Sequence, residues 1–441
     1  MKIMTLTKQD ASIIRATTSV CPQCLGEIPA QVIERDGAVY FRKRCEVHGG
    51  FEIEVSRNPA DYRYLSKAYF YFLQSPMPPA EYYLCATTAC NADCPICFLK
   101  QCPEQLDGLS LKEVERIAAD KSVKRFTFSH GEATTCPELP AMIGILKQHG
   151  KIVNIHTNGI KAADPEYAAQ LKRAGIDQVS LQFDAFSRKK SVDLRGDGSL
   201  DRQLRALENL KELKIPVTLN VTIAKGVNED EVGVIFDHAV KEGFIKDLSF
   251  ITYCHYDRAK GDNFGRYMMP DELITCIEAH SKGRIARPQV VFFQKLFYAY
   301  MHVAGIRKCF NYFHYPVVRW NGGYLPVSDF INLKKAAAWL DRLEDNKKGL
   351  TVFTFFGVVL SSLRLRSLLL LPWGLLMLLR RGYPQASGNF LMVTFATICD
   401  PYKYDPAIAV NCGQGIIIKD KAHDSYGTYL MQEMSRKRQA S

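Results

Sequence analysis

The most constraining feature of this sequence is a sixfold alternation of short apolar strands and amphipathic helices over residues 82–253. The alternation predicts parallel pairing, because each helix returns the chain to begin the next strand in the same direction. Such crossovers build either an open doubly wound α/β sheet or a barrel, and in both the chemistry gathers at the carboxyl ends of the strands. The predicted strands are 82–85, 125–129, 153–156, 178–183, 217–223 and 248–252.

Three of the fourteen cysteines follow the first predicted strand directly, at Cys90, Cys94 and Cys97. Residues 1–18 contain no charged start followed by an apolar run and a cleavage site, so we expect the chain to be cytoplasmic. Closely spaced cysteines in a reducing compartment indicate metal ligands. A four-iron cluster normally takes four cysteines, so a three-cysteine loop leaves one iron open to an exogenous ligand.

Polar residues also stand at the ends of the next three strands. Gly131 and Glu132 follow the second strand, Asn158 follows the third, and Gln182 and Asp184 follow the fourth. Their positions predict a shared site with the cysteine loop. Two of them have a simpler interpretation, since Asn158 begins an Asn-Gly turn and Asp184 suits a cap for the following segment.

The cysteine spacing and these strand ends together resemble the radical S-adenosylmethionine (radical SAM) superfamily. Residues 129–132 stand where that family's Gly-Gly-Glu element meets the methionine amino group, with His130 in place of the first glycine. The resemblance implies a partial (β/α)6 barrel and a 4Fe–4S cluster that binds S-adenosylmethionine and cleaves it to a 5'-deoxyadenosyl radical. It also implies a reducing electron donor of the flavodoxin or ferredoxin type. It assigns cofactor binding to Gly131, Glu132, Asn158, Gln182, Asp184 and Arg195, of which Arg195 suits the cofactor carboxylate.

Residues 1–75 contain a second set of metal-ligand residues. Two ligand pairs with two-residue gaps enclose an alternating stretch whose Asp-Gly turn, at residues 36 and 37, predicts a hairpin. This pattern predicts a tetrahedral site in a ribbon module, which would hold structural zinc or a rubredoxin-like iron with an electron-transfer role. The ligands are Cys21, Cys24, Cys45 and His48, although His48 also suits a turn before two glycines.

A metal ribbon in front of a radical SAM core, here residues 76–255, resembles one subgroup of the superfamily. That subgroup contains the archaeal pterin dimethyltransferase and the tetraether lipid synthases, and its members carry extra clusters on C-terminal cysteines. Cys309, Cys399 and Cys412 are the matching positions for an auxiliary 4Fe–4S cluster, and a buried free cysteine is the alternative for each. We interpret the remaining cysteines as core or incidental residues: Cys85, Cys102, Cys136, Cys254 and Cys276.

Beyond residue 255 the regular alternation fades into a mixed region, residues 256–441, with an apolar segment at 349–379. Its two runs, 349–363 and 367–379, have 15 and 13 uncharged residues. A bilayer crossing needs roughly 20, so these runs suit buried helices, a substrate-lining lid or an interfacial segment with peripheral membrane contact.

The net charge of +11, from 57 basic and 46 acidic residues, suits either anionic partners or ordinary solvated faces. No platform of interleaved basic and aromatic residues is visible in the sequence, so we expect no nucleic acid partner.

The leading functional hypothesis is an enzyme that removes a hydrogen from an unactivated carbon and then alkylates or methylates it. The apolar segment at 349–379 favours a lipid substrate. One alternative is methylation of a pterin-like heterocycle. Another is a non-catalytic iron–sulfur or electron-carrier protein. This alternative is suggested by His130, which stands where the family has the first glycine of its Gly-Gly-Glu element.

Overall fold

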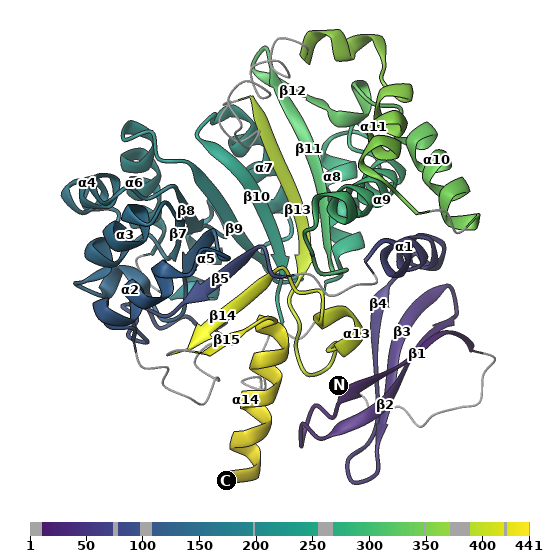
Figure 1. Cartoon of the computed structure of the whole chain (residues 1–441), viewed down its shortest axis with the longest axis horizontal. Coiled ribbons are helices and arrows are strands. Elements are labelled where there is room, and N and C mark those ends of the chain that lie inside the picture. The colour runs from purple at the N-terminus through teal and green to yellow at the C-terminus, as the bar shows by residue number, and fades with distance from the viewer. Residues whose placement is uncertain are drawn as a thin grey trace.

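The centre of the protein is a single eleven-stranded sheet. The computed structural model describes residues 11–73, 78–97, 108–196, 199–254, 268–346, 349–370, 389–418 and 421–440. Within them the strand order is β12-β11-β13-β10-β9-β8-β7-β6-β5-β14-β15 (Figure 1).

The six predicted strands are confirmed. Each pairs in parallel with the next along the chain, and most of their side chains are buried. In β9 buried apolar side chains alternate with half-buried polar ones, because successive side chains of a strand point to opposite faces. The six strands are β5 (Glu81–Leu84), β6 (Arg125–Phe128), β7 (Ile152–Thr157), β8 (Gln178–Gln182), β9 (Val217–Ile223) and β10 (Ile245–Thr252).

Helices with clear start and stop residues connect these strands. The first begins with a reciprocal capping box between Ser110 and Glu113. The third begins at an Asp164 cap followed by proline and ends at Gly175, whose φ of 89° is the left-handed conformation that favours glycine. The connecting helices are α2 (Leu111–Ala119), α3 (Leu139–Gln148), α4 (Pro165–Ala174), α5 (Arg188–Arg195), α6 (Ser199–Glu212) and α7 (Glu231–Lys241).

The C-terminal region extends the parallel sheet at both of its edges. Strand β13 (Phe390–Thr397) pairs in parallel with β10, and β14 (Gln414–Ile418) pairs in parallel with β5. Outside these, β11 (Tyr312–Trp320), β12 (Gly323–Pro326) and β15 (Lys421–His423) run antiparallel. The sequence did not predict these five strands, because none of them belongs to a repeated strand–helix unit.

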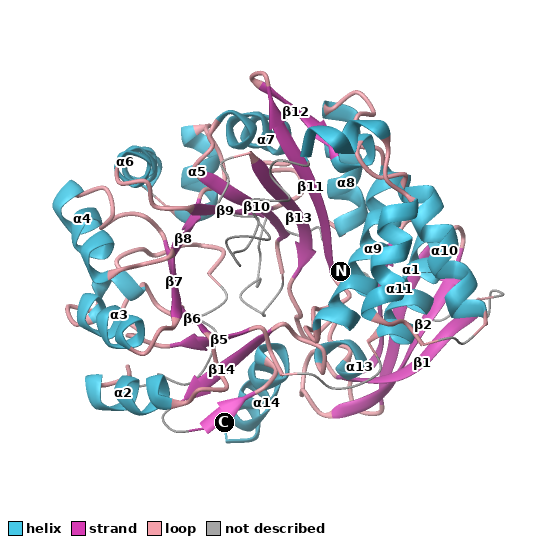
Figure 2. Ribbon diagram, turned by 45° about the horizontal axis from the view of Figure 1, so that its top comes forward, coloured by secondary structure: helices cyan, strands magenta, loops and turns pink. Residues whose placement is uncertain are grey.

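The sheet curves into a partial barrel. Figure 2 shows the strands bending around a central space, with helices α2–α7 on the outside. The described sheet ends at β12 on one side and β15 on the other, so it does not close. The sequence-based expectation of a partial (β/α)6 barrel is confirmed, with an added parallel strand on either side.

A lobe of helices packs beside β11 (Figure 1). Buried Lys295 joins two of these helices by ion pairs to Asp341 and Glu344. The lobe contains α8 (Pro270–His280), α9 (Arg287–Ala304), α10 (Leu333–Asp345) and α11 (Val352–Ser361). Among the described helices none has the length and apolarity that a membrane crossing requires.

The N-terminal ribbon is a separate four-stranded antiparallel sheet. Asp36 and Gly37 have φ values of 51° and 74°, as a two-residue type I′ hairpin turn requires, so the predicted hairpin is confirmed. Its strands are β1 (Ser12–Val20), β2 (Glu27–Arg35), β3 (Ala38–Cys45) and β4 (Gly49–Ser56).

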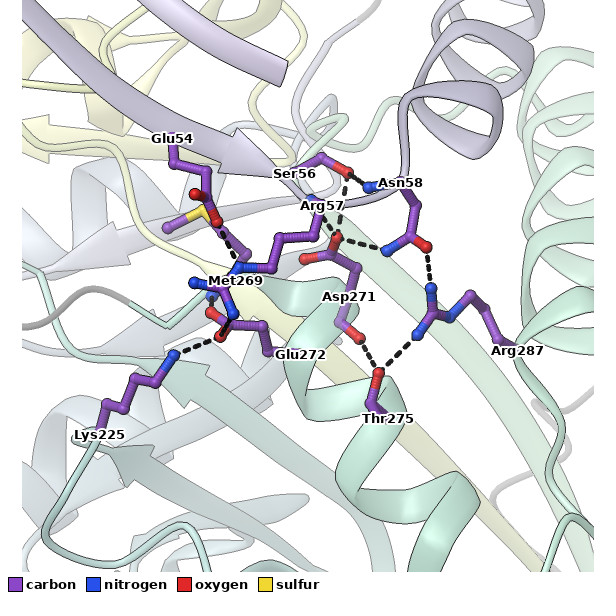
Figure 3. A network of polar contacts seen from close by, with 10 residues as sticks. All are labelled: Glu54, Ser56, Arg57, Asn58, Lys225, Met269, Asp271, Glu272, Thr275 and Arg287. Atoms are coloured by element: carbon purple, nitrogen blue, oxygen red, sulfur yellow. Dashed lines mark hydrogen bonds and ion pairs between the residues drawn. The ribbon is translucent and has the colours of Figure 1, made fainter. Parts of the chain in front are cut away.

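One junction between the ribbon and the barrel lies at the link between β4 and α1 (Pro59–Phe72). Asp271 Oδ2, at the start of α8, accepts hydrogen bonds from Ser56 Oγ at 3.0 Å, Arg57 N at 2.8 Å and Asn58 Nδ2 at 2.8 Å (Figure 3). Arg287 of α9 donates to Asn58 Oδ1 from the other side. The Asp271 carboxylate therefore helps to fix the orientation of the ribbon relative to the barrel.

A second junction joins the ribbon to residues 400–405. Asp405 accepts hydrogen bonds from Arg15 and from Thr17 Oγ1, the latter at 2.9 Å. Buried Lys43 donates to Ser19 Oγ at 3.0 Å and to the carbonyl oxygen of Pro401 at 2.6 Å. The ribbon is thus attached both to the start of α8 and to the C-terminal part of the chain.

We predict that Asp271→Ala lowers the free energy of unfolding by about 2–3 kcal/mol, because three donors lose a charged acceptor in a partly buried site. Chemical denaturation would measure the difference. Glu166→Ala is the control, since Glu166 makes only an exposed ion pair with Arg173 and its loss should cost about 0.5 kcal/mol or less. Equal effects of the two substitutions would contradict the role of the Asp271 junction.

Candidate active site and metal centres

A cavity of about 300 Å³ lies at the carboxyl ends of the parallel strands. Residues from successive strand ends line one side of it: Cys90, Cys94, Cys97, Glu132, Asn158, Gln182, Arg195 and Thr222. The C-terminal region lines the other side with Cys309, Tyr312, Cys399, Cys412, Gln414 and Tyr426. Apart from Thr222, which the sequence did not single out, these first residues were predicted to share a site, and the structure brings them together.

The cysteine loop that follows β5 presents three thiols to this cavity. Cys94 is buried, Cys97 is half-buried and Cys90 is exposed, and none of them is in a disulfide. Burial raises the pKa of the Cys94 thiol, and neighbouring Arg195 opposes that rise. Three thiols on one loop beside an open cavity fit a 4Fe–4S cluster with one exposed iron.

Gly131 is required by the close contact of the β6 loop with the cysteine loop. A β-carbon at this position would lie 2.6 Å from the carbonyl oxygens of Ala89 and Thr87. Its φ is 51°, and the next residue, Glu132, donates its backbone N–H to Ala89 O at 2.8 Å. Gly131 therefore acts through its missing side chain, which lets the two loops meet.

His130 keeps the backbone conformation that a glycine would adopt there, with a φ of 78°. Its side chain is buried, and burial lowers its pKa to about 4, so the imidazole is neutral. Its Nε2 lies 3.1 Å from the hydroxyl oxygen of Tyr426, which belongs to α14 (Tyr426–Ala440). The departure from the family's glycine thus links the β6 loop to the C-terminal helix.

Glu132 is buried at the base of the cavity, and burial raises its pKa. Oε1 accepts hydrogen bonds from Thr134 N, Thr134 Oγ1 and Thr157 Oγ1, at 3.2, 2.5 and 2.7 Å. Oε2 accepts one, from Asn158 N at 2.7 Å. Because each carboxylate oxygen offers two lone pairs, Oε2 retains acceptor capacity for a ligand ammonium group.

Asn158 connects three loops. Its side-chain amide donates to Asn91 Oδ1 in the cysteine loop at 2.8 Å, and its oxygen accepts from Ile160 N at 3.0 Å. The second contact is the Asx-type turn that the sequence left open as an alternative. Asn158 therefore has a structural part in holding the cysteine loop, in addition to lining the cavity.

Asp184 lies behind the cavity wall and holds Arg195. Arg195 Nε donates to Asp184 Oδ2 at 2.6 Å, and Arg195 Nη2 donates to Thr222 Oγ1 at 2.8 Å. Asp184 is buried and is absent from the residues that line the cavity, whereas Gln182 and Arg195 line it. Among the three, the two lining residues are placed to meet a ligand and Asp184 is placed to orient the guanidinium.

Aromatic residues that the sequence did not single out surround the rest of the cavity. The rings of Tyr83 and Tyr426 meet edge to face with centroids 5.2 Å apart, and Tyr83 meets His156 in the same way at 5.3 Å. Tyr253 and Tyr312 also line this space. Tyr426 had no sequence signal, because it comes from a helix almost 300 residues after its partner His130.

Four cysteines converge on the same cavity from the C-terminal side: Cys254, Cys309, Cys399 and Cys412. Because Thr252 of β10 is paired with Thr397 of β13, Cys254 and Cys399 each stand two residues beyond neighbouring strands. Cys309 precedes the antiparallel strand β11, and Cys412 precedes β14. Cys254 is buried in an apolar cluster, as its interpretation as a core residue expects, and the pairing of β10 with β13 also brings it beside Cys399.

The ribbon ligands form a compact quartet. The sulfur and nitrogen atoms of Cys21, Cys24, Cys45 and His48 all lie within 4.8 Å of one another. Cys24 Sγ and Cys45 Sγ are 4.0 Å apart, and His48 Nδ1 is 3.5 Å from Cys45 Sγ. Tetrahedral bonds of about 2.3 Å from zinc to sulfur separate neighbouring sulfurs by about 3.8 Å, so the quartet fits one zinc-sized ion.

The described part of the apolar segment does not contribute to this cavity. Residues 349–370 form α11 and the short helix η4 (Leu365–Leu370), and none of residues 349–367 lines the cavity. Residues 371–379 lie outside the described residues. The lid interpretation of the apolar segment therefore has no support from residues 349–367.

We predict that Gly131→Ala disrupts the cysteine loop, because the new methyl group would overlap backbone oxygens that cannot move independently. The reconstituted protein should bind less iron and unfold at a lower temperature. Gly144→Ala is the matched control: it lies within α3 with open space around it, and should raise stability by roughly 0.5–1 kcal/mol. Unchanged iron content in Gly131→Ala would contradict the close-contact argument.

Comparisons with known proteins agree with this geometry. Residues 84–239 match the Radical SAM superfamily model, and residues 13–57 match the HMPTM N-terminal zinc ribbon domain. The 7,8-dihydro-6-hydroxymethylpterin dimethyltransferase of Methanocaldococcus jannaschii is 28% identical over 302 residues, which are 62% of this chain and 60% of that protein. A probable GTP 3',8-cyclase of Pyrococcus abyssi is 30% identical over 168 residues, 37% of this chain and 53% of that protein.

The chain thus spans about 60% and about half of the lengths of these two relatives. Among solved structures, SuiB of Streptococcus suis bound to S-adenosylmethionine matches with a TM-score of 0.41 and 18% identity, over 47% of this chain and 48% of that one. The zinc ribbon match favours zinc over a rubredoxin-like iron in the N-terminal quartet. The family matches show that this chain contains a radical SAM domain, with an HMPTM-type zinc ribbon domain in front of it.

Proposed function

We propose that this radical SAM enzyme replaces a C–H bond of a polar, planar heterocycle by a carbon–carbon bond, as in methylation or alkylation. The observation that carries the proposal is the division of one cavity into a side that suits the cofactor and a side walled by tyrosines. The activity in the name of the Methanocaldococcus jannaschii relative, a pterin dimethyltransferase, is of the same kind.

The cofactor side is formed by the cysteine loop and the ends of β6, β7 and β8. A 4Fe–4S cluster on the loop would supply the electron that cleaves S-adenosylmethionine. Glu132 Oε2 has a lone pair available for the amino group of the methionine, and Arg195 offers a cation for its carboxylate. Asp184 keeps Arg195 directed toward the loop, since burial alone would disfavour the charged guanidinium.

The substrate side carries Tyr83, Tyr253, Tyr312 and Tyr426, with Gln414 and two histidines between them. Flat aromatic walls favour a ring substrate through stacked or edge-to-face contacts, and the amide and imidazole groups can bond its polar edge. Burial lowers the pKa of both His130 and His156, so neither would add a positive charge near neutral pH. These features support a neutral heterocycle.

The lipid hypothesis rested on the apolar segment 349–379, and none of residues 349–367 lines the cavity. The non-catalytic alternative rested on His130. It loses support because the backbone there keeps the left-handed conformation that a glycine would supply.

We predict that anaerobically reconstituted enzyme with dithionite and a reduced pterin consumes S-adenosylmethionine and releases 5'-deoxyadenosine. Cys94→Ala should abolish both. Cys276→Ala, a half-buried α8 residue outside the cavity lining, should retain them. Chromatography of the nucleoside products gives the readout. Cofactor cleavage stimulated by a membrane lipid extract and not by pterins would refute the heterocycle, and no cleavage with either would refute the enzymatic proposal.

We also infer that Cys254, Cys309, Cys399 and Cys412 hold an auxiliary 4Fe–4S cluster. Four thiols that reach one cavity from four chain segments provide the usual ligand number of such a cluster. Contact with Cys309 and burial raise the pKa of Cys399 well above its ordinary value, and burial raises that of Cys254 to about 12. Such thiols are costly to ionise without a bound cation, which favours a metal cluster among them.

Cys254→Ser tests this inference. We expect the reconstituted variant to lose about four iron atoms per chain relative to the parent, or to show a changed paramagnetic resonance signal. Cys276→Ser is the control and should keep the parent's iron and sulfide content. Identical iron content and spectra for Cys254→Ser and the parent would overturn the four-cysteine ligand set.

A further inference from the structure

Helix α11 is apolar on the side that faces solvent as well as on the side that faces the protein. Phe355 and Val358 are buried, and the Phe355 ring lies 6.1 Å from that of Tyr300 on α9. On the outer side Phe353 is 89% exposed and Leu360 is 65% exposed. A helix on the surface of a globular protein normally turns polar residues outward, and α11 contains no charged residue at all.

The exposed apolar surface continues past the end of the helix. Leu363 and Leu365 are exposed, the latter by 84%, and a β-bridge between Ile331 and Leu363 fixes this segment beside the start of α10. We call these side chains the α11 patch: Val352, Phe353, Phe356, Leu360, Leu363 and Leu365. Large apolar side chains gathered in this way mark a binding surface.

Basic residues border the α11 patch. Arg364 and Arg366 alternate with its two last leucines, and Lys334 and Lys335 are exposed at the start of α10. Lys335 lies close to α11, since its Nζ donates to the carbonyl oxygen of Ser361. Residues 349–370 contain no Asp or Glu, and Asp329 forms an ion pair with Arg366. The rim of the patch is therefore positively charged.

We propose that the α11 patch docks the enzyme on the surface of an anionic lipid bilayer. Phe353, Phe356 and Leu360 enter the boundary between head groups and acyl chains, while the bordering Arg and Lys side chains meet lipid phosphates. The charge decides this partner over a second copy of the chain, because a twofold contact through this face would bring the same basic residues together. The proposal is independent of the proposed reaction.

Flotation with vesicles tests the proposal. We expect the full-length reconstituted enzyme to float with vesicles of phosphatidylcholine and phosphatidylglycerol, and to bind pure phosphatidylcholine vesicles far less. Added salt should weaken the binding, and Arg364→Gln should weaken it about fivefold, the effect of one basic residue near a charged surface. The double substitution Phe353→Ser, Phe356→Ser should lower the affinity at least tenfold.

The matched control is Ile13→Ser, Val234→Ser, which removes two exposed apolar side chains from the ribbon and from α7. It should float as the parent does. Both double variants should keep the parent's iron content and cofactor cleavage, since none of the four residues lines the cavity.

Two other results would overturn the proposal. Dimerisation that is lost in Phe353→Ser, Phe356→Ser, without vesicle binding by the parent, would identify a second copy as the occupant. Failure of the parent to float with either vesicle, with no dimer, would rule out the α11 patch as a membrane-docking surface.

Discussion

Parallel pairing in one register is the constraint on which the rest of this structure depends. Each of the strands β5–β10 delivers its carboxyl end to the same mouth, and β13 and β14 extend that arrangement at both edges. Residues far apart in the sequence are therefore brought together by the register in which neighbouring strands pair. Cys254 and Cys399 become neighbours because Thr252 of β10 is paired with Thr397 of β13. The site is a consequence of which strands pair.

Within that frame, backbone contacts hold the cysteine loop in place. Gly131 lets the β6 loop touch the carbonyls of residues 87 and 89, Glu132 N–H bonds one of them, and Asn158 bonds Asn91. An ion pair then positions the cation of the site, since Asp184 holds the Arg195 guanidinium beside Cys94. A buried cation without such a partner would cost several kcal/mol, so this ion pair lets a guanidinium remain charged next to the thiols.

The parts of the fold and the site that the sequence predicted well are those that depend on patterns of neighbouring residues. Apolar runs placed all six barrel strands, ligand spacing placed the zinc quartet, and strand ends gave Glu132, Asn158 and Gln182. What it missed depends on pairing across long separations. Strands β13 and β14 do not belong to a regular strand–helix repeat, so no periodic pattern in the sequence predicts them. Nothing near Tyr426 or Cys254 in the sequence marks them as site residues, because they reach the cavity through the position of α14 and the pairing of β10 with β13. Asp184 was predicted to meet the cofactor, whereas in the structure it lies outside the cavity lining and binds Arg195.

The ribbon supports the far wall of the cavity as well as holding a metal. Its metal-binding turn places Leu25 against Cys254, Tyr404 and Leu430, and the same apolar group includes Cys399 and Tyr426. Beside it, Lys43 and Asp405 tie β1 and β3 to the segment that follows Cys399. A zinc ion bound by the quartet would hold that turn in place, and would thereby support the wall that carries Tyr426, Cys254 and Cys399. Metal binding in the ribbon and order at the reaction site are therefore physically connected.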